Sequence, residues 1–363
     1  MLCRVVDNLG DAGVSWRLAR QLSVEFGWRV TLTIDRPDLL ARFGADPRTG
    51  VRVEAWPDDV SPSAPVREAP PDDDVLISAF GCEPPAPLRA ALAGGPRRPL
   101  WINLEYLSAE AWIDGCHGLR STRPADGALE HYFYPGFTER SGGLLRERGL
   151  FERRDAFVGS PAQREWLGNL GIVPEAHERL VTLFCYPGAP IAEWLAAVAA
   201  GACAHRVLVP DPVVDAALAG FFGAAPAPGQ SARHGRLLIQ RIPFLTQDDY
   251  DRLLWSADLN FVRGEDSWIR AQWAARPFIW QPYVQSDQAH QVKLQAFLER
   301  LEAGAQVEAM MRAWSGAGAL APAWRAFDEQ LAALGPVFRE WPAQLGAQPD
   351  LATRLVEFCD QRL

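Results

Sequence analysis

Apolar and polar positions alternate along the start of the chain in an order that predicts strand, helix and strand in turn. Residues 2–6 form a short apolar run typical of a β-strand, and residues 28–34 form another. Between them lie a turn over residues 7–13 and a stretch with apolar positions at helical spacing, which predicts a helix over residues 14–26. A strand, a glycine-containing turn, a helix and a second strand make a βαβ unit, so we expect a parallel sheet with helices on its faces.

The same alternation continues along the chain in two series. In the first series, further strands are predicted at residues 51–56, 75–80, 100–105 and 131–134. In the second series, strands are predicted at residues 180–186, 205–209, 237–242, 259–263 and 277–282. Helical patterns separate the strands of the second series, for example at residues 248–256 and 288–302. The segment 57–74 is rich in Pro and Asp, which predicts an exposed loop.

Two series of alternating strands and helices predict two α/β domains. A chain of 363 residues is long for a single core, so its length favours the same division. We expect two Rossmann-like domains facing across a cleft, the N-terminal one over residues 1–165 and the C-terminal one over residues 166–345. The last helix, in residues 346–363, is expected to pack back on the N-terminal domain.

Composition narrows the classes of partner and compartment. The net charge of −9 argues against a nucleic-acid partner, which needs a cationic surface. No apolar run approaches the roughly 18 residues of a membrane span, so no membrane partner is expected. The six cysteines show neither a CxxC pair nor a metal-type spacing with histidine. This usage predicts a reducing cytoplasmic location and no metal site.

The first candidate for chemistry is the turn over residues 7–13, because ligands of open α/β sheets bind at the carboxyl ends of strands. The turn has two glycines three positions apart and lacks the G-x-G-x-x-G pattern of dinucleotide sites. Two interpretations stay open at this point. Asp7 or Asp11 acts as a base or as the partner of a cation, or Asp11 merely caps the helix that follows.

The second candidate is the sequence RGEDS at residues 263–267. An apolar strand ends at Arg263, Gly264 permits a tight turn, and Asp266 or Ser267 can cap the next helix. The free N–H groups at that helix start favour an anion. Glu265 can accept hydrogen bonds from two ribose hydroxyls, as acidic residues do in other nucleotide sites. The alternative is a plain strand-to-helix turn.

Other predicted strands of the second series also end in aromatic and amide side chains. These are Phe184, Tyr186, Phe244, Gln247 and Tyr283. Taken singly, each position is more often part of a core or a loop. Together they can stack on a nucleotide base and bind its edge, because the ends of parallel strands share one edge of a sheet.

Five segments in the same order resemble the protein-arginine rhamnosyltransferases that modify bacterial translation elongation factor P, the EarP family. They are residues 6–20, 103–110, 184–186, 263–268 and 281–285. The family pattern more often has Phe where Leu9 stands and Ile where Ala12 stands. Both differences keep an apolar or small side chain, so neither touches a proposed catalytic group.

The resemblance implies a GT-B glycosyltransferase that binds its acceptor protein on the N-terminal domain. It implies dTDP-β-L-rhamnose as donor, an arginine of elongation factor P as acceptor, inversion at the sugar, and no metal or other cofactor. By position, Asp11 matches the essential aspartate of the family and Asp7 its acidic partner. The resemblance assigns Glu265, Asp266 and Ser267 to the donor ribose and pyrophosphate. It assigns Phe184, Tyr186, Phe244, Gln247 and Tyr283 to the thymidine and phosphate site.

Chemistry sets its own limits on these roles. A guanidinium has a pKa above about 12, so a carboxylate cannot deprotonate it outright. Asp11 is expected to bind and orient the guanidinium and to take the proton as the bond forms, with Glu265 as an alternative assistant. Arg263 either faces the phosphates or pairs with a carboxylate. The rival hypotheses are another nucleotide sugar or a small-molecule acceptor, a Rossmann oxidoreductase, and a non-catalytic binding protein.

Overall fold

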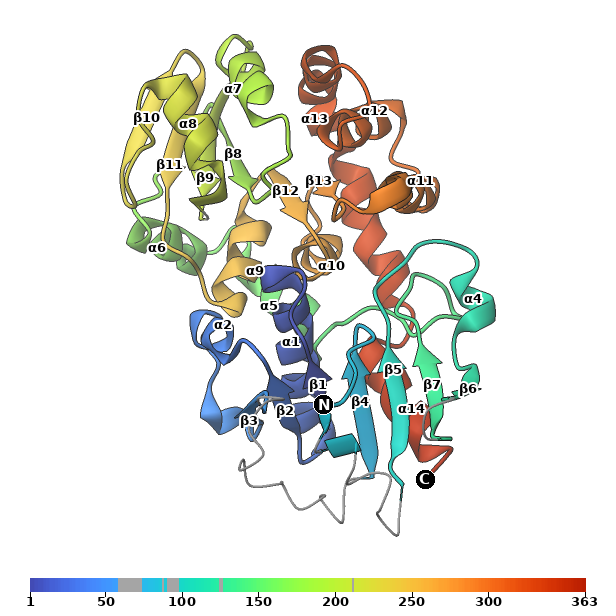
Figure 1. Ribbon diagram of the computed structural model, residues 1–363. Coiled ribbons are helices and arrows are strands. Elements are labelled where there is room, and N and C mark those ends of the chain that lie inside the picture. Colours follow the sequence, from blue (N-terminus) through green and yellow to red (C-terminus); the bar gives the residue numbers. More distant parts are fainter. Residues whose placement is uncertain (58–73, 87, 90–97, 124–126, 211) are drawn as a thin grey trace. The chain divides into compact units, whose positions relative to one another are not determined.

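The computed structural model describes residues 1–57, 74–86, 88–89, 98–123, 127–210 and 212–363. The loop predicted at 57–74 lies almost wholly outside these residues. The chain divides into two compact units, each described here by itself (Figure 1). Unit 1 comprises Met1–Arg148 with Gly346–Leu363, and unit 2 comprises Gly149–Leu345.

Unit 1 is built on a seven-stranded sheet in the order β3-β2-β1-β4-β5-β7-β6. Its strands are β1 (Leu2–Cys3), β2 (Thr31–Ile34), β3 (Arg52–Ala55), β4 (Val75–Ala79), β5 (Leu100–Leu104), β6 (Arg120–Thr122) and β7 (Leu129–Phe133). Its helices include α1 (Asn8–Phe26), α2 (Pro37–Arg42), α4 (Ile113–Cys116) and α14 (Leu351–Asp360), with a short 3-10 turn η1 (Pro47–Thr49). Every strand pair is parallel except β6 against β7, which confirms the predicted parallel sheet.

Unit 2 is built on a six-stranded sheet in the order β10-β11-β9-β8-β12-β13, green to orange in Figure 1. Its strands are β8 (Glu178–Leu183), β9 (Ala204–Val209), β10 (Ser231–His234), β11 (Leu237–Arg241), β12 (Leu259–Arg263) and β13 (Phe278–Gln281). Its helices include α5 (Leu150–Phe157), α6 (Pro161–Asn169), α7 (Ile191–Ala199), α8 (Asp215–Phe222), α9 (Gln247–Ser256), α10 (Asp266–Trp273), α11 (Ala289–Leu301), α12 (Ala305–Trp314) and α13 (Leu320–Gly346). Two 3-10 turns are η2 (Pro212–Val214) and η3 (Ser286–Gln288).

All the strands predicted in both series are present, with ends that differ by a few residues. The two strands that the apolar pattern missed are β6 and β10, which are short, polar and antiparallel to their single neighbours. Each lies at the edge of its sheet, and its side chains are mostly exposed to solvent. A pattern that depends on burial therefore does not detect them.

The second unit begins at Gly149 rather than at residue 166, because α5 packs on unit 2. The ring of Phe151 lies 5.8 Å from that of Trp273, and Arg154 donates a hydrogen bond of 2.7 Å to the Trp273 carbonyl. The ring of Phe157 lies 6.0 Å from that of Trp255. Two aromatic side chains and one arginine thus join this helix to unit 2, although the prediction had placed it in the first domain.

The last helix, α14, belongs to unit 1 and is red in Figure 1. Asp350 caps it by accepting hydrogen bonds from the N–H groups of Ala352 and Thr353. The same carboxylate accepts a bond of 3.1 Å from Gln21 on α1, which joins the two helices. The Leu351 N–H donates to the Leu144 carbonyl at 3.0 Å. The chain therefore returns to its first unit after completing the second.

An aromatic cluster packs against β12 of the unit 2 sheet. The ring of Phe261 on β12 lies 4.8 Å from that of Trp194 and 4.5 Å from that of Trp314. All three side chains are fully buried. Because Phe261 precedes Arg263 by two positions, this core holds the strand end where the predicted donor loop begins. Among the described residues, no helix is both long and apolar enough to cross a membrane.

Candidate functional site

Most of the acidic segment 7–13 of unit 1 is helical, so the prediction of a turn over these residues is wrong. Helix α1 begins at Asn8, which places Asp11 in its first turn. The Asp11 Oδ2 atom accepts hydrogen bonds from the backbone N–H groups of Val6, at 2.8 Å, and Asp7, at 2.9 Å. A carboxylate that reaches back to the residue before a helix stabilises an early helix start, as in a capping box.

The same bonds explain why β1 ends at Cys3 although residues 2–6 are apolar. The backbone N–H of Val5 donates to Asp35 Oδ1 at 3.0 Å, and the next two N–H groups donate to Asp11. Carboxylates thus replace the neighbouring strand as the partners of this backbone. Asp11 is not the N-cap residue, so the interpretation that it merely caps the helix is wrong in its simple form. Its side chain instead anchors the loop that precedes α1.

Asp11 is buried, with 2% of its surface exposed. Burial raises the pKa of its carboxyl, and the charge of Asp7 raises it further, against the lowering effect of the backbone hydrogen bonds. A carboxylate with a raised pKa is a stronger base than one in water. The geometry therefore allows the interpretation of Asp11 as a base as well as an anchor.

The carboxylate of Asp7 lies directly against Gly10. A Cβ atom added to Gly10 would lie 2.7 Å from Asp7 Oδ2, closer than van der Waals contact allows. The backbone also closes here, with the Gly10 N–H donating to the Asp7 carbonyl at 2.7 Å. Glycine at this position thus leaves room for the Asp7 side chain beside the first turn of α1.

The RGEDS sequence of unit 2 forms the predicted tight turn between β12 and α10. Gly264 has a φ of 56°, in the left-handed region that favours glycine. Its N–H donates to the Gln281 carbonyl at 3.2 Å, and its own carbonyl accepts a bond of 2.9 Å from the Trp280 indole. The Trp280 ring in turn stacks on that of Trp268 at 3.7 Å. The turn is therefore held by both neighbouring elements.

The expected cap of α10 by Asp266 or Ser267 is wrong, because the helix already begins at Asp266. Glu265 occupies the N-cap position, and its side chain makes no cap hydrogen bond. The Ser267 hydroxyl instead accepts the Arg263 N–H at 3.0 Å and donates to the Arg263 carbonyl at 2.5 Å. The N-terminus of α10, with its helix dipole, remains suited to an anion.

The side chain of Arg263 lies among aromatic rings at the end of β12. Its guanidinium carbon is 4.4 Å from the ring centre of Phe184 and 4.6 Å from that of Tyr186. Only 8% of Arg263 is exposed. A guanidinium held over two rings is a fixed positive charge with little freedom to move.

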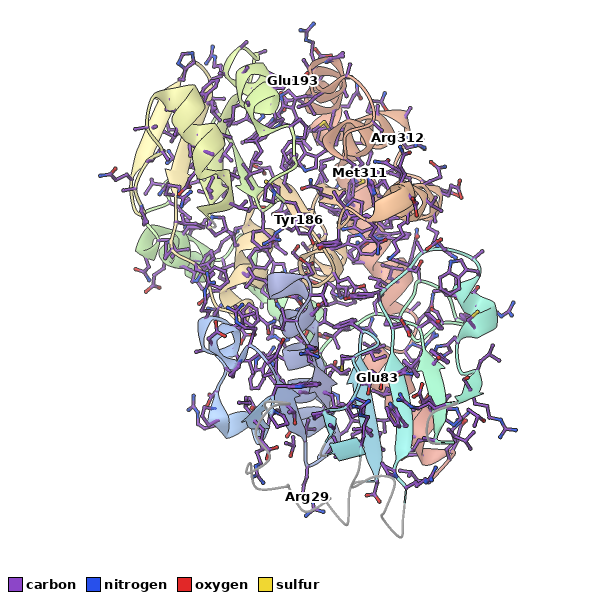
Figure 2. The ribbon with its side chains drawn as sticks, viewed as in Figure 1. Arg29, Glu83, Tyr186, Glu193, Met311 and Arg312 are labelled. Atoms are coloured by element: carbon purple, nitrogen blue, oxygen red, sulfur yellow. The ribbon has the colours of Figure 1, made fainter. Side chains whose placement is uncertain are left out.

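Tyr186 links this cationic position to Tyr283 after β13. Tyr186 follows the end of β8, where Figure 2 labels it, and its ring meets that of Tyr283 edge to face at 5.5 Å. The Tyr186 N–H donates to the Gln281 side chain at 2.8 Å. Tyr283 is 46% exposed, so the group has an open aromatic end. The structure thus brings Phe184, Tyr186, Arg263 and Tyr283 together.

Phe244 and Gln247 follow the carboxyl end of β11, where the chain enters α9. Gln247 is the first residue of that helix and is 4% exposed, while Phe244 precedes it in the connection from β11. Further along α9, the Tyr250 ring lies 5.8 Å from that of Phe184. Both predicted residues therefore lie at the carboxyl edge of the sheet that carries Arg263.

Sequence reasoning missed two residues of this group. Gln281 was noticed only as part of a strand end, yet its buried amide fixes the backbone of Tyr186. Tyr250 was read only as part of a helical pattern, yet it packs behind Phe184. An amide at the end of an apolar strand was the available signal in the sequence for Gln281. The role of Tyr250 depends on how α9 packs, which the sequence does not show.

Comparison with known proteins places the whole chain in one family. The family described as elongation factor P rhamnosyltransferase EarP matches residues 1–360. A protein-arginine rhamnosyltransferase of Pseudomonas aeruginosa is 46% identical, covering 99% of this chain and 97% of its own length. One of Shewanella oneidensis is 36% identical, covering 99% of this chain and 96% of its own length.

Solved structures agree with this relationship. A structure described as the basis of EarP-mediated arginine glycosylation of translation elongation factor EF-P has a TM-score of 0.69 and 32% identity, covering 100% of this chain and 98% of its own. The glycosyltransferase VinC, solved with dTDP, has a TM-score of 0.53 at 14% identity, covering 99% of both chains, and shows the fold alone. The predicted GT-B architecture is confirmed. The chain therefore belongs to the EarP family of elongation factor P rhamnosyltransferases and is a glycosyltransferase.

Proposed function

We propose that this protein transfers L-rhamnose from dTDP-β-L-rhamnose to an arginine side chain of translation elongation factor P, with inversion at the sugar. The observation that carries the proposal is the family match over residues 1–360. The two units supply chemistry that agrees with it. Unit 1 holds a buried carboxylate with a raised pKa, and unit 2 holds a fixed cation near the N-terminus of α10.

In this proposal unit 2 binds the donor. The guanidinium of Arg263 and the N-terminus of α10 offset the negative charge that grows on the leaving diphosphate. Phe184, Tyr186 and Tyr283 contact the thymidine, and Glu265 accepts hydrogen bonds from the ribose. Positive charge from the chain itself lets the reaction proceed without a metal ion, so chelation with EDTA is expected to leave turnover unchanged.

In the same proposal unit 1 binds the acceptor. Asp11 orients the guanidinium so that one nitrogen faces the anomeric carbon, and Asp7 adds negative charge that favours the cationic acceptor. The new C–N bond forms as the C–O bond to the diphosphate breaks, and dTDP leaves with the bonding electrons. Asp11 takes the proton that the nitrogen loses. A single displacement of this kind inverts the configuration.

The test is the intact mass of elongation factor P after incubation with this protein and dTDP-rhamnose. A gain of one deoxyhexose supports the proposal, and an unchanged mass contradicts it. Titration with dTDP, UDP and GDP checks the donor, since the proposal requires a clear preference for dTDP. The free state of all six cysteine thiols agrees with a proposed cytoplasmic location.

Asp11→Asn is expected to abolish transfer while calorimetry shows donor affinity near that of the wild type. Normal turnover would remove Asp11 from the mechanism. Asp35→Asn is the matched control, because Asp35 is also a carboxylate that accepts a backbone N–H of the same loop. If the loss in Asp11→Asn came only from a loosened loop, Asp35→Asn would show a similar loss.

A further inference from the structure

An exposed tryptophan, Trp112, lies on unit 1 directly before α4 (Figure 1). Its side chain is 50% exposed, whereas the other described aromatic residues of unit 1 are at least partly buried. The Trp112 ring meets that of Tyr134 edge to face, with centroids 5.3 Å apart. Trp112 therefore has one packed side and one side open to solvent.

The two rings lie at the edge of the sheet that also carries the acidic start of α1. Tyr134 follows the end of β7, and β1, β4, β5 and β7 are parallel neighbours in this order, so their carboxyl ends share one edge. Phe80 follows β4 and Tyr106 follows β5, and their rings are stacked with centroids 4.5 Å apart. Aromatic rings therefore extend along this edge from Trp112 towards Asp7.

The loop that carries Trp112 is fixed to the segment after β7. Ser108 and Gly136 form a parallel β-bridge, and the Ser108 N–H donates to the Pro135 carbonyl at 3.3 Å. A Cβ atom added to Gly136 would lie 2.5 Å from Ile113 Cδ1, so α4 packs closely on this backbone. An exposed ring on a fixed backbone loses little freedom when a partner binds, which suits an anchor of a protein interface.

Carboxylates accompany these rings. The Glu105 N–H donates to the Phe133 carbonyl at 2.9 Å, which places Glu105 next to the position of Tyr134. Burial, and then the charge of Glu105, raises the pKa of the Tyr134 phenol to about 12. Glu110 lies on the loop between β5 and α4, where the Ser108 hydroxyl donates to it at 2.9 Å. Rings and negative charge together are complementary to a cationic protein surface.

The length of this edge matches the size of an ordinary protein interface. Neighbouring strands lie about 4.8 Å apart, so the ends of β1 and β7 are roughly 14 Å apart. A standard interface buries about 800 Å² on each partner, a patch roughly 30 Å across. A protein whose arginine lies at Asp11 can therefore cover both the end of β1 and the Trp112 ring.

We propose that Trp112 is the residue on which the acceptor protein docks. This inference rests on the proposed function, because it takes the acceptor to be elongation factor P. Tyr134 supports the Trp112 ring, whose open side contacts the acceptor surface that flanks the target arginine. Glu105 and Glu110 attract basic residues of that surface. Unit 1 thus recognises the folded acceptor and not its arginine alone.

The first test is the affinity for elongation factor P, measured by calorimetry with and without dTDP. Trp112→Ala should weaken binding about 30-fold, the loss typical of an aromatic hot spot, and Trp112→Phe should recover most of it. The KM for the acceptor should rise by a similar factor, with kcat and the KM for dTDP-rhamnose near the wild-type values.

Leu129→Ala is the matched control, because Leu129 is 52% exposed at the opposite end of β7. The melting temperature of Trp112→Ala should stay near that of the wild type, since an exposed side chain contributes little to stability. An unchanged affinity in Trp112→Ala, or an equal loss in Leu129→Ala, would overturn the proposal. A dimer of this chain that Trp112→Ala dissociates in sedimentation would assign the surface to a second copy and overturn it as well.

Glu110→Gln tests the contribution of charge. The association rate constant should fall several-fold at low salt, and the difference from the wild type should disappear at high salt, because salt screens exposed charges. A rate constant equal to that of the wild type at low salt would contradict the role of the carboxylate.

The mass of the acceptor decides the proposed function separately. If the wild-type protein binds elongation factor P but adds no rhamnose, the proposed function fails, and the affinity of Trp112→Ala still decides the docking surface. If rhamnose is added and Trp112→Ala binds as tightly as the wild type, the docking proposal alone fails. If the wild-type protein does not bind elongation factor P, both fail.

Discussion

Breaking the ion pair between Asp251 on α9 and Arg270 on α10 should lower the free energy of unfolding by a predictable amount. Arg270 donates from Nε to Asp251 Oδ1 at 2.9 Å and from Nη2 to Oδ2 at 2.6 Å. The two residues are 4% and 2% exposed. Asp251→Asn keeps the shape of the side chain but removes the negative charge that pairs with the buried Arg270 guanidinium.

Removing one partner of a buried pair costs about 3–5 kcal/mol. The asparagine carbonyl can still accept one hydrogen bond, so the expected loss in free energy of unfolding lies at the lower end of this range, ~3 kcal/mol. For a unit of this size, each kcal/mol lowers the melting temperature by about 2–4 °C, so a fall of at least ~6 °C is expected. The assay is urea unfolding followed by tryptophan fluorescence. Trp268 and Trp273 lie on the same helix as Arg270 and report on it.

Two further variants test whether the lost stability comes from the buried charge. In the double variant Asp251→Leu with Arg270→Met, both charges are gone, so most of the lost stability should return. Asp38→Asn breaks the exposed pair between Arg36 and Asp38 and should leave the unfolding midpoint unchanged. A loss below about 1 kcal/mol in Asp251→Asn, or a double variant no more stable than the single one, would refute the reasoning.

The remaining predictions concern pH, a helix cap and the donor. Burial, and then the charge of Arg354, lowers the pKa of His117 to about 4, so the folded protein favours the neutral ring. Stability should therefore fall as the pH drops from the unfolded value near ~6.5 towards 4, and urea unfolding of His117→Gln across this range should lack that decline. Asp350→Ala removes the cap of α14 and should cost about 1–2 kcal/mol in the same assay. Glu265→Ala should lose donor affinity in calorimetry, and an unchanged affinity would place the ribose contact elsewhere.

The apolar pattern was sufficient for most elements because burial of a strand or helix leaves a periodic trace in the local sequence. The bounds of β12 agree with the prediction at residues 259–263. The same pattern failed at the start of α1, where the polar residues of 7–13 suggested a turn. There the Asp11 carboxylate stabilises the early helix start by bonding the preceding backbone. Such a bond leaves no trace in the spacing of apolar residues.

The sequence by itself determined the α/β class, the candidate carboxylates and the strand ends that carry aromatic residues. Only the tertiary structure decided what these residues do to one another. Arg263 meets Phe184 because β8 and β12 are neighbours in the sheet. The ring of Tyr106 stacks on that of Phe80 because β4 and β5 are neighbours in the sheet. The periodicity of burial is local and can be read along the chain, whereas contacts between strand ends depend on the order of strands, which only the folded sheet establishes.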